Sequence, residues 1–281
     1  MAVILDGRLV ASVVMEELKE QVKTVRTRGV TPTLALVFVG EDRYSRQYVE
    51  MKARRCREVG VEARVYDLPS LSAEKDVISL IQRLNEDSSV HGVLVQLPLP
   101  MGMDELRVVE AISPVKDVDC LSPVSLGKVL MGGEAFLPAG VEAILELLRR
   151  HSISFEGKHW VAVGLSNIVG KPLAAYLMNQ NVKLTCCKGN EADLAEQTRR
   201  ADVLVVDMAR KWAVTADMVK KGCVVFDNGN NYEGKKVYGD VDFEAVRDVA
   251  SAITPVPGGI GPVLVTMLIR NTVGAASKPS S

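Results

Sequence analysis

The stretch HWVAVGLSNIVGKP (159–172) determines the fold predicted for the second half of the chain. Its first six residues form a compact apolar run typical of a buried parallel strand, and a helical pattern begins near its end. Glycines at such a junction let the backbone approach a diphosphate, and the helix N-terminus supplies free N–H groups. Because Ser166 replaces the middle glycine of G-x-G-x-x-G, the stretch alone fits a dinucleotide site and a plain strand-to-helix turn equally well.

Strand and helix patterns alternate along the chain, which predicts βαβ units, mostly parallel sheets and an α/β fold. Apolar runs typical of strands lie at 33–40, 61–68, 92–100, 159–164, 182–187, 202–208 and 223–229. Helical patterns lie at 8–28, 44–59, 73–86, 141–150, 169–180 and 262–276. The segment 102–137 contains Ser-Pro and Gly-Gly pairs and is expected to be a loop.

The length and charge of the chain limit its class. It has 281 residues, about enough for two domains, and its 34 basic and 35 acidic side chains give a net charge of -1. This balance argues against a nucleic-acid partner or a membrane surface, both of which favour basic proteins. Residues 249–269 are uncharged, but Pro255, Pro257 and Pro262 would break a spanning helix there.

The cysteines and histidines indicate a reducing compartment and no metal centre. Five Cys are scattered without a C-x-x-C pair, which fits a cytoplasmic protein better than a disulfide scaffold. His91, His151 and His159 show no metal-ligand spacing, so no zinc site is expected. The N-terminus has Asp6 and no basic region before an apolar stretch, which does not fit a secretory signal.

Tyr48 and Lys52 are four residues apart in a predicted helix and therefore lie on one face. A phenol and an ammonium in this arrangement can meet at one substrate, and a lysine with a lowered pKa can act as an acid or a base near neutrality. Most such pairs are surface contacts, so the pair alone leaves both interpretations open.

Three further segments carry residues suited to a ligand site, although each also fits a simple turn. Gln96-Leu97-Pro98-Leu99-Pro100 follows a predicted parallel strand, and ligands of open α/β sheets bind at that edge. Lys116-Asp117-Val118-Asp119 offers carboxylates that can accept paired hydrogen bonds from an amidine-like ring edge. The segment TPVPGGIGP (254–262) indicates backbone packed closely on another group.

The end of the second strand in this half bears on the choice of cofactor. Cys186-Cys187-Lys188 offers no acid for a ribose 2′-hydroxyl. Lys188 suits a 2′-phosphate instead, which favours NADP and leaves NAD possible. An ordinary solvated lysine is the alternative interpretation.

Taken together and in this order, these motifs resemble the bifunctional methylenetetrahydrofolate dehydrogenase/methenyltetrahydrofolate cyclohydrolase family over residues 3 to 273. The motifs are L-D-G at 5–7, Y-x-x-x-K at 48–52, Q-L-P-L-P at 96–100, K-D-V-D at 116–119, S-N-I-V-G-K-P at 166–172, G-D-V at 239–241 and T-P-V-P-G-G at 254–259. The resemblance implies an enzyme, usually a homodimer, that binds folate between two α/β domains. It implies oxidation of 5,10-methylenetetrahydrofolate with a nicotinamide cofactor, followed by hydrolysis of the methenyl product to 10-formyltetrahydrofolate.

The resemblance also implies roles for single residues and segments. Lys52 would be the general acid/base of the hydrolysis, Tyr48 would orient substrate and lysine, Gln96 would hydrogen-bond Lys52 and hold its pKa down, and Asp119 would grip the pterin ring. Further implied substrate contacts are Leu97, Pro98, Pro257, Gly258 and Gly259. Implied cofactor contacts are Gly164, Leu165, Ser166, Ile168, Gly170, Lys171, Lys188, Ala209 and Asn228. Residues 1–137 would form the folate-binding catalytic domain and 138–261 a Rossmann-like NAD(P)-binding domain, with helix 262–281 packing back on the first.

The departures from the family pattern lie in the cofactor half. The family's P-C-T-P is Ala135-Phe136-Leu137-Pro138 here, its C-H-S-x-T is CCKGN (186–190), its A-x-G-x-P is DMARK (207–211), and a Thr usual after V-G-P is absent from IGPVL (260–264). Asp207 or Arg210 is therefore expected to alter the cofactor pocket. The main alternative is a cyclohydrolase with lost or weakened dehydrogenase activity, and a further one is a non-enzymatic nucleotide-binding module. A short-chain dehydrogenase, which also uses Y-x-x-x-K, does not fit the chain order.

Overall fold

The computed structural model describes residues 1–133, 136–234 and 236–278 and divides into two compact units. Unit 1 comprises Met1–Ser12, Leu130–Gly132 and Gly140–Leu264, and unit 2 comprises Val13–Val129, Gly133–Ala139 and Val265–Ser281. The α/β fold class with mainly parallel sheets is confirmed. Of the segments named above, Ala135 and the last three residues of helix 262–281 lie outside the described residues.

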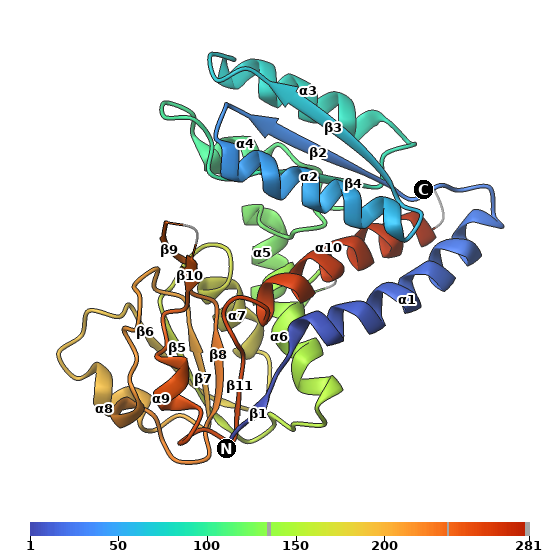
Figure 1. Cartoon of the computed structure of the whole chain (residues 1–281). Helices are drawn as coiled ribbons and strands as arrows, with labels where there is room; N and C mark the ends of the chain where they lie inside the picture. The colour runs from blue at the N-terminus through green and yellow to red at the C-terminus, as the bar shows by residue number, and fades with distance from the viewer. Residues whose placement is uncertain (134–135, 235, 279–281) are drawn as a thin grey trace. The chain divides into compact units, whose positions relative to one another are not determined.

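Unit 2 is built on a parallel three-stranded sheet in the order β3-β2-β4. Its strands are β2 (Thr33–Val39), β3 (Glu62–Leu68) and β4 (Gly92–Val95). The helices that lie in it are α2 (Arg43–Glu58), α3 (Glu74–Glu86), α4 (Glu105–Glu110) and α5 (Pro123–Leu130), together with most of α1 (Gly7–Arg26) and α10 (Ile260–Ser277). Figure 1 shows α2 and α3 on opposite sides of this sheet.

The central strand β2 is buried on both faces, as expected for a parallel sheet covered by helices. Its alternate residues Ala35, Val37 and Val39 pack with α3 residues such as Val77 and Ile81 in one hydrophobic cluster. The opposite alternation then directs Leu34, Leu36 and Phe38 to the other face. Two-sided burial fixes the register, and with it the position at which each strand ends.

Unit 1 contains a parallel six-stranded sheet in the order β1-β11-β8-β7-β5-β6 and an antiparallel hairpin, β9-β10. The sheet strands are β1 (Val3–Ile4), β5 (His159–Val163), β6 (Lys183–Cys187), β7 (Val203–Val206), β8 (Val224–Asp227) and β11 (Ala252–Ile253). The hairpin strands are β9 (Asn231–Glu233) and β10 (Lys236–Tyr238). The helices are α6 (Ala139–Arg150), α7 (Gly170–Leu177), α8 (Leu194–Thr198), a 3₁₀ turn at Ala216–Met218 and α9 (Phe243–Val246).

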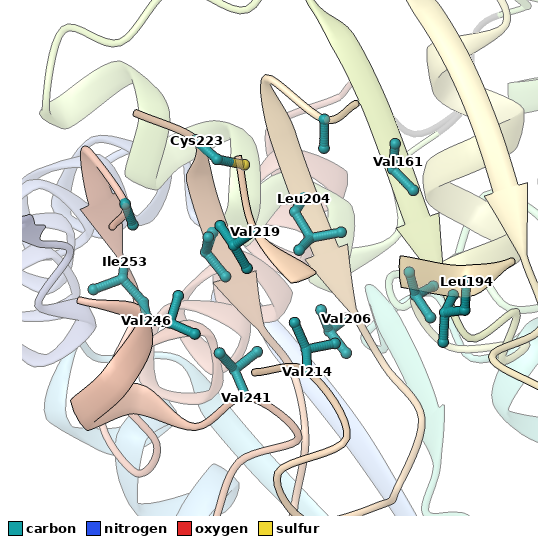
Figure 2. Packing of buried hydrophobic residues seen from close by; sticks show 14 of the residues in the cluster. Val161, Leu194, Leu204, Val206, Val214, Val219, Cys223, Val241, Val246 and Ile253 are labelled. Atoms are coloured by element: carbon teal, nitrogen blue, oxygen red, sulfur yellow. The ribbon is translucent and has the colours of Figure 1, made fainter. Parts of the chain in front are cut away.

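One face of this sheet is covered by an apolar cluster, shown in Figure 2. Val161, Leu204 and Ile253 come from three of the strands, and Leu194 and Val246 come from α8 and α9. At about 25 cal/mol per Å² of buried apolar surface, side chains of this size each stabilise the folded state by roughly 1.5–3 kcal/mol. The cluster therefore holds the strands, and the loops that follow them, in fixed register.

The structure differs from the sequence expectations in two segments. Residues 1–12 group with unit 1 and not with the first catalytic segment, because β1 pairs in parallel with β11 at the edge of the large sheet. The segment 102–137 is not all loop, since it contains α4 and α5. Asp104 caps α4 by accepting from the Leu106 and Arg107 amides, and Pro123 starts α5, where its missing N–H costs nothing.

Among the described residues, α10 is the one helix whose length and composition would let it cross a membrane. In the protein, 61% of its apolar window is buried. Its Asn271 amide donates to the carbonyl oxygens of Val118 and Leu137 within unit 2. These features are typical of a core helix that ties loops together.

Asp227 at the end of β8 is a structural carboxylate of unit 1. It is 3% exposed and accepts hydrogen bonds from the Gly229, Asp240 and Val241 amides at 2.8, 3.0 and 2.9 Å, and burial raises its pKa to about 6. Replacing Asp227 by Ala removes the acceptor of all three amides and is expected to cost about 3 kcal/mol. A clearly lowered Tm would show this. The exposed Asp248→Ala is the control, and equal Tm values for the two variants would contradict the structural role.

Candidate active site

Helix α2 positions Tyr48 and Lys52 in unit 2. Asp42 caps the helix by accepting from the Ser45 amide at 2.7 Å, and Val49 and Ala53 anchor its buried face. Tyr48 is 40% exposed, and Lys52, one turn further on, is half-buried. The pair therefore lies at the border between the helix face that packs and the face that is open.

Gln96 directly follows β4 and brings an amide to Lys52. Its backbone amide donates to the Val37 carbonyl at 2.8 Å, which continues the sheet pairing and fixes where the side chain begins. Lys52 Nζ donates to Gln96 Oε1 at 3.0 Å, and Gln96 Nε2 donates to the Leu97 carbonyl at 2.6 Å. Leu97 is half-buried and Pro98 is exposed beside this pair.

Burial lowers the pKa of Lys52, against an opposing attraction from the charge of Asp119. Burial likewise raises the pKa of Asp119, and the charge of Lys52 opposes that shift. A lysine in this setting is partly neutral closer to physiological pH than a solvated one. The structure corrects the implied role of Gln96 here: its oxygen accepts from Lys52 and so favours the ammonium, which leaves burial as the cause of the lowered pKa.

In the loop that carries K-D-V-D, Lys116 and Asp117 hold the loop in place, whereas Asp119 interacts with Lys52. Lys116 Nζ donates to the Leu84 and Asp87 carbonyls at 2.9 and 2.7 Å, which ties the loop to the end of α3. Asp117 is buried and accepts from the Leu121 and Ser122 amides. Asp119 is half-buried and interacts electrostatically with Lys52.

In unit 1, the loop between β5 and α7 lies at the point where the strand order reverses. β5 has β6 on one side and β7 on the other, and ligands of open α/β sheets bind outside the strand ends at such a switch point. A Cβ at Gly164 would lie 1.9 Å from the Asp207 carbonyl oxygen, and one at Gly170 would lie 2.1 Å from the Gly164 oxygen. Only glycine allows these close backbone approaches, as a nucleotide loop requires.

The side chains around this loop differ in how well they suit a nucleotide, unlike its glycine backbone. Leu165 is half-buried, Ile168 is exposed, and exposed Lys171 donates to Asn167 Oδ1 at 2.7 Å. Asn228, after β8, donates to Asp207 Oδ1 at 3.1 Å, and Ser166 donates to the other oxygen of Asp207. The glycine backbone therefore has the close approaches that a nucleotide loop needs, while Asp207 adds a carboxylate beside it.

Lys188 and Ala209 lie on the loops that follow β6 and β7. Lys188 is exposed, and its backbone amide donates to Glu191 Oε1 at 2.6 Å. Ala209 has a φ of 52°, in the left-handed region where the family pattern has glycine, and its amide donates to Asp240. Sequence reasoning missed Glu191, which closes the loop around Lys188 and could have been noticed as an acid three residues beyond it.

The L-D-G and T-P-V-P-G-G motifs, far apart in sequence, meet inside unit 1. The Gly7 amide donates to the Gly258 carbonyl at 2.9 Å, and a Cβ at Gly7 would lie 1.7 Å from the Gly259 oxygen. Gly258 has a φ of 116°, while Pro257 beside it is exposed. The close backbone packing expected of 254–262 is thus present, and its neighbour is the N-terminal segment.

Two domains of one protein family match the chain, and each match contains one of the two sites described above. The tetrahydrofolate dehydrogenase/cyclohydrolase catalytic domain matches residues 5–119, and the NAD(P)-binding domain of the same family matches residues 138–280. The chain belongs to this family. Its catalytic-domain match contains Lys52, Gln96 and Asp119, and its NAD(P)-binding match contains the Gly164 loop.

Family members from bacteria align over nearly the whole chain. The chain is 44% identical to the bifunctional protein FolD of Halalkalibacterium halodurans over 99% of each chain. It is 46% identical to FolD of Exiguobacterium sp., covering 99% of this chain and 100% of that protein.

Solved structures of the family superpose closely. The bifunctional FolD of Campylobacter jejuni has a TM-score of 0.96 at 40% identity, covering 98% of this chain and 99% of its own. The FolD of Trypanosoma brucei, solved with NADP and an inhibitor, has a TM-score of 0.93 at 33% identity, covering 98% of this chain and 97% of its own.

Some of the predicted site residues contact one another in the structure, and others bond only within their own loops. In unit 2, Lys52 contacts Gln96 directly and Asp119 through its charge, with Tyr48 one helical turn away. In unit 1, Ser166 and Asn228 meet at Asp207. Lys171 and Lys188 bond locally within their own loops.

Proposed function

We propose that the chain oxidises 5,10-methylenetetrahydrofolate with NADP and hydrolyses the methenyl product to 10-formyltetrahydrofolate. The observation that carries the proposal is the 3.0 Å bond from Lys52 to Gln96 at the carboxyl end of β4, in a chain of the dehydrogenase/cyclohydrolase family. In this proposal Asp119 binds the pterin ring, Tyr48 orients substrate and lysine, and Leu97, Pro98, Pro257, Gly258 and Gly259 contact the substrate.

Lys52 supplies the acid and base of the hydrolysis in this scheme. The neutral amine takes a proton from the water that attacks the methenyl carbon, and the resulting ammonium delivers a proton to the ring nitrogen as its bond to that carbon breaks. The hydroxyl formed on that carbon releases its own proton to solvent as the formyl C=O forms. The lowered pKa makes the neutral form available, and the charge of Asp119 keeps the amine basic enough to accept the proton. Gln96 fixes the direction of the amine through its hydrogen bond.

The oxidation requires mainly that two rings be aligned, because the two nitrogens flanking the methylene stabilise the cation that forms. When bound, NAD(P) would supply the hydride acceptor for this oxidation. Residues of the Gly164–Lys171 loop, together with Ala209 and Asn228, would hold the cofactor. Lys188 supports NADP over NAD, since its ammonium suits a 2′-phosphate.

A cofactor-resolved assay tests this function. Methenyltetrahydrofolate formation is followed with NADP and with NAD separately, and hydrolysis of added methenyltetrahydrofolate is followed in parallel. Turnover with NADP exceeding turnover with NAD, together with hydrolysis, is expected. Hydrolysis without oxidation by either cofactor would remove the dehydrogenase half, and faster turnover with NAD would overturn the NADP preference.

Asp119→Asn is expected to shift the pH dependence of hydrolysis. The Asp119 charge raises the pKa of Lys52, so its removal lowers that pKa, and the rise of kcat with pH moves to lower pH. Loss of a charged hydrogen bond to the ring should also raise KM by roughly 10- to 100-fold. The exposed Asp76→Asn on α3 is the control. An unmoved or upward-shifted profile in Asp119→Asn would contradict the coupling.

The proposal extends to the state of the protein in the cell. We expect a cytoplasmic protein, as its scattered cysteines indicate, and a homodimer, as the resemblance implies. Light scattering on the purified chain would measure its mass. A monomeric mass at working concentrations would exclude the dimer.

A further inference from the structure

Asp207 places a carboxylate at the switch point of unit 1, where the family pattern A-x-G-x-P has alanine. It directly follows β7, beside the glycine loop after β5, and its own carbonyl is the atom that Gly164 approaches. A negative charge here lies on the edge of the sheet that would receive the diphosphate of a nucleotide. Because the family pattern has alanine at this position, the fold does not need the Asp207 carboxylate. The hydrogen bonds of the carboxylate therefore indicate its role.

Both oxygens of Asp207 are engaged by loops of the neighbouring strands. Ser166 Oγ donates to Oδ2 from the loop after β5, and Asn228 Nδ2 donates to Oδ1 at 3.1 Å from the loop after β8. The Ser166 hydroxyl in turn accepts from the Ile168 and Val169 amides at 3.2 and 3.1 Å. Amides at the start of a helix are the usual donors to a phosphate, so this network occupies donors that a nucleotide would use.

The charges around Asp207 do not neutralise it. Burial and the nearby Asp240 carboxylate raise its pKa, while the bonds from Ser166 and Asn228 and the Gly170 amide oppose that shift. Charged groups on the adjoining loops and strand ends bond to other partners. Lys171 donates to Asn167, and Arg210 donates to the Gly189 carbonyl. Asp240 accepts from the amides of 208–210, and Asp227 accepts from those of 229, 240 and 241. Within the described residues, no basic side chain forms an ion pair with Asp207.

We infer that Asp207 is an affinity-determining residue of the nucleotide site, whose carboxylate holds the glycine loop closed and opposes the diphosphate of NAD(P). The inference rests on the proposed nicotinamide-dependent oxidation. The ionised carboxylate competes with the diphosphate for the loop and repels it, whereas the protonated form does neither. Removing this charge is therefore expected to raise nucleotide affinity.

Titration calorimetry on the full chain with NADP and with NAD tests this inference. The variants are Asp207→Asn and Asp207→Ala, with the exposed Asp248→Asn as a charge-matched control. Both Asp207 variants are expected to bind about fivefold tighter than the native chain, and Asp248→Asn should bind as the native chain does.

The outcomes separate the inference from the proposed function. Nucleotide binding with equal Kd in the native chain and both Asp207 variants overturns the inference alone. Weaker binding in Asp207→Asn also overturns it, because the carboxylate would then be contributing to binding. Absence of binding in every variant counts against both the inference and the oxidation.

Discussion

Replacing Lys52 by methionine is expected to lower the rate of methenyltetrahydrofolate hydrolysis by at least about a hundredfold, the usual contribution of a positioned acid or base. Methionine keeps most of the buried volume of the side chain but has no proton to give or take. The oxidation depends on ring alignment and should be reduced far less. Hydrolysis and oxidation rates measured on the same preparation would show the difference.

A neighbouring residue on the same helix provides the control for this prediction. The Arg54 side chain is 68% exposed, so Arg54→Met changes a charge on α2 without changing the buried site. Its hydrolysis rate should stay near that of the native chain. Retained hydrolysis in Lys52→Met would remove the lysine from the mechanism, and an equal loss in both variants would attribute the effect to α2 as a whole.

Gly164→Ala is expected to destabilise unit 1 strongly and to weaken nucleotide binding by at least about tenfold. The added Cβ would lie 1.9 Å from the Asp207 carbonyl oxygen, and both groups are backbone, so no side-chain rotation relieves the overlap. The residue also has a φ of +83°, which costs an alanine roughly 1–2 kcal/mol by itself. Together these effects should lower stability by about 3 kcal/mol or more.

Gly222 separates the cost of the clash from the cost of the backbone angle. It has the same φ of +83° in the same unit, yet a Cβ there would meet nothing within 4 Å. Gly222→Ala should therefore show only the conformational cost, with nucleotide Kd unchanged. Thermal unfolding and nucleotide titration of both variants would test this, and equal Tm shifts would mean that the close approach at Gly164 is relieved by movement of the backbone.

Local patterns were sufficient to predict the longer strands of the two sheets and the helices that cover them. Apolar runs such as 33–40 and 159–164 became β2 and β5, and the helical spacing of 44–59 became α2, each within two residues of the predicted ends. These elements are long or buried on both faces, so their composition reflects their environment. The short elements β1, β9, β10, β11, α4, α5, α8 and α9 were not predicted, because a few residues carry too little periodicity.

The candidate sites needed long-range contacts that spacing does not reveal. The four-residue interval fixed Tyr48 and Lys52 on one face, but the bond from Lys52 to Gln96 joins positions 44 residues apart. Likewise the two acids of K-D-V-D look equivalent in sequence, and only the amides of Leu121 and Ser122 distinguish Asp117 as structural.

The order of most strands and helices, the glycine loop and the shared helix face of Tyr48 and Lys52 were thus set by local sequence, because periodicity and backbone sterics act over a few residues. The burial that lowers the pKa of Lys52, the meeting of Gly7 with Gly259 and the linkage of Ser166 and Asn228 to Asp207 were decided by tertiary structure alone. Parallel strand pairing causes this division, since it places at one sheet edge residues that are distant along the chain.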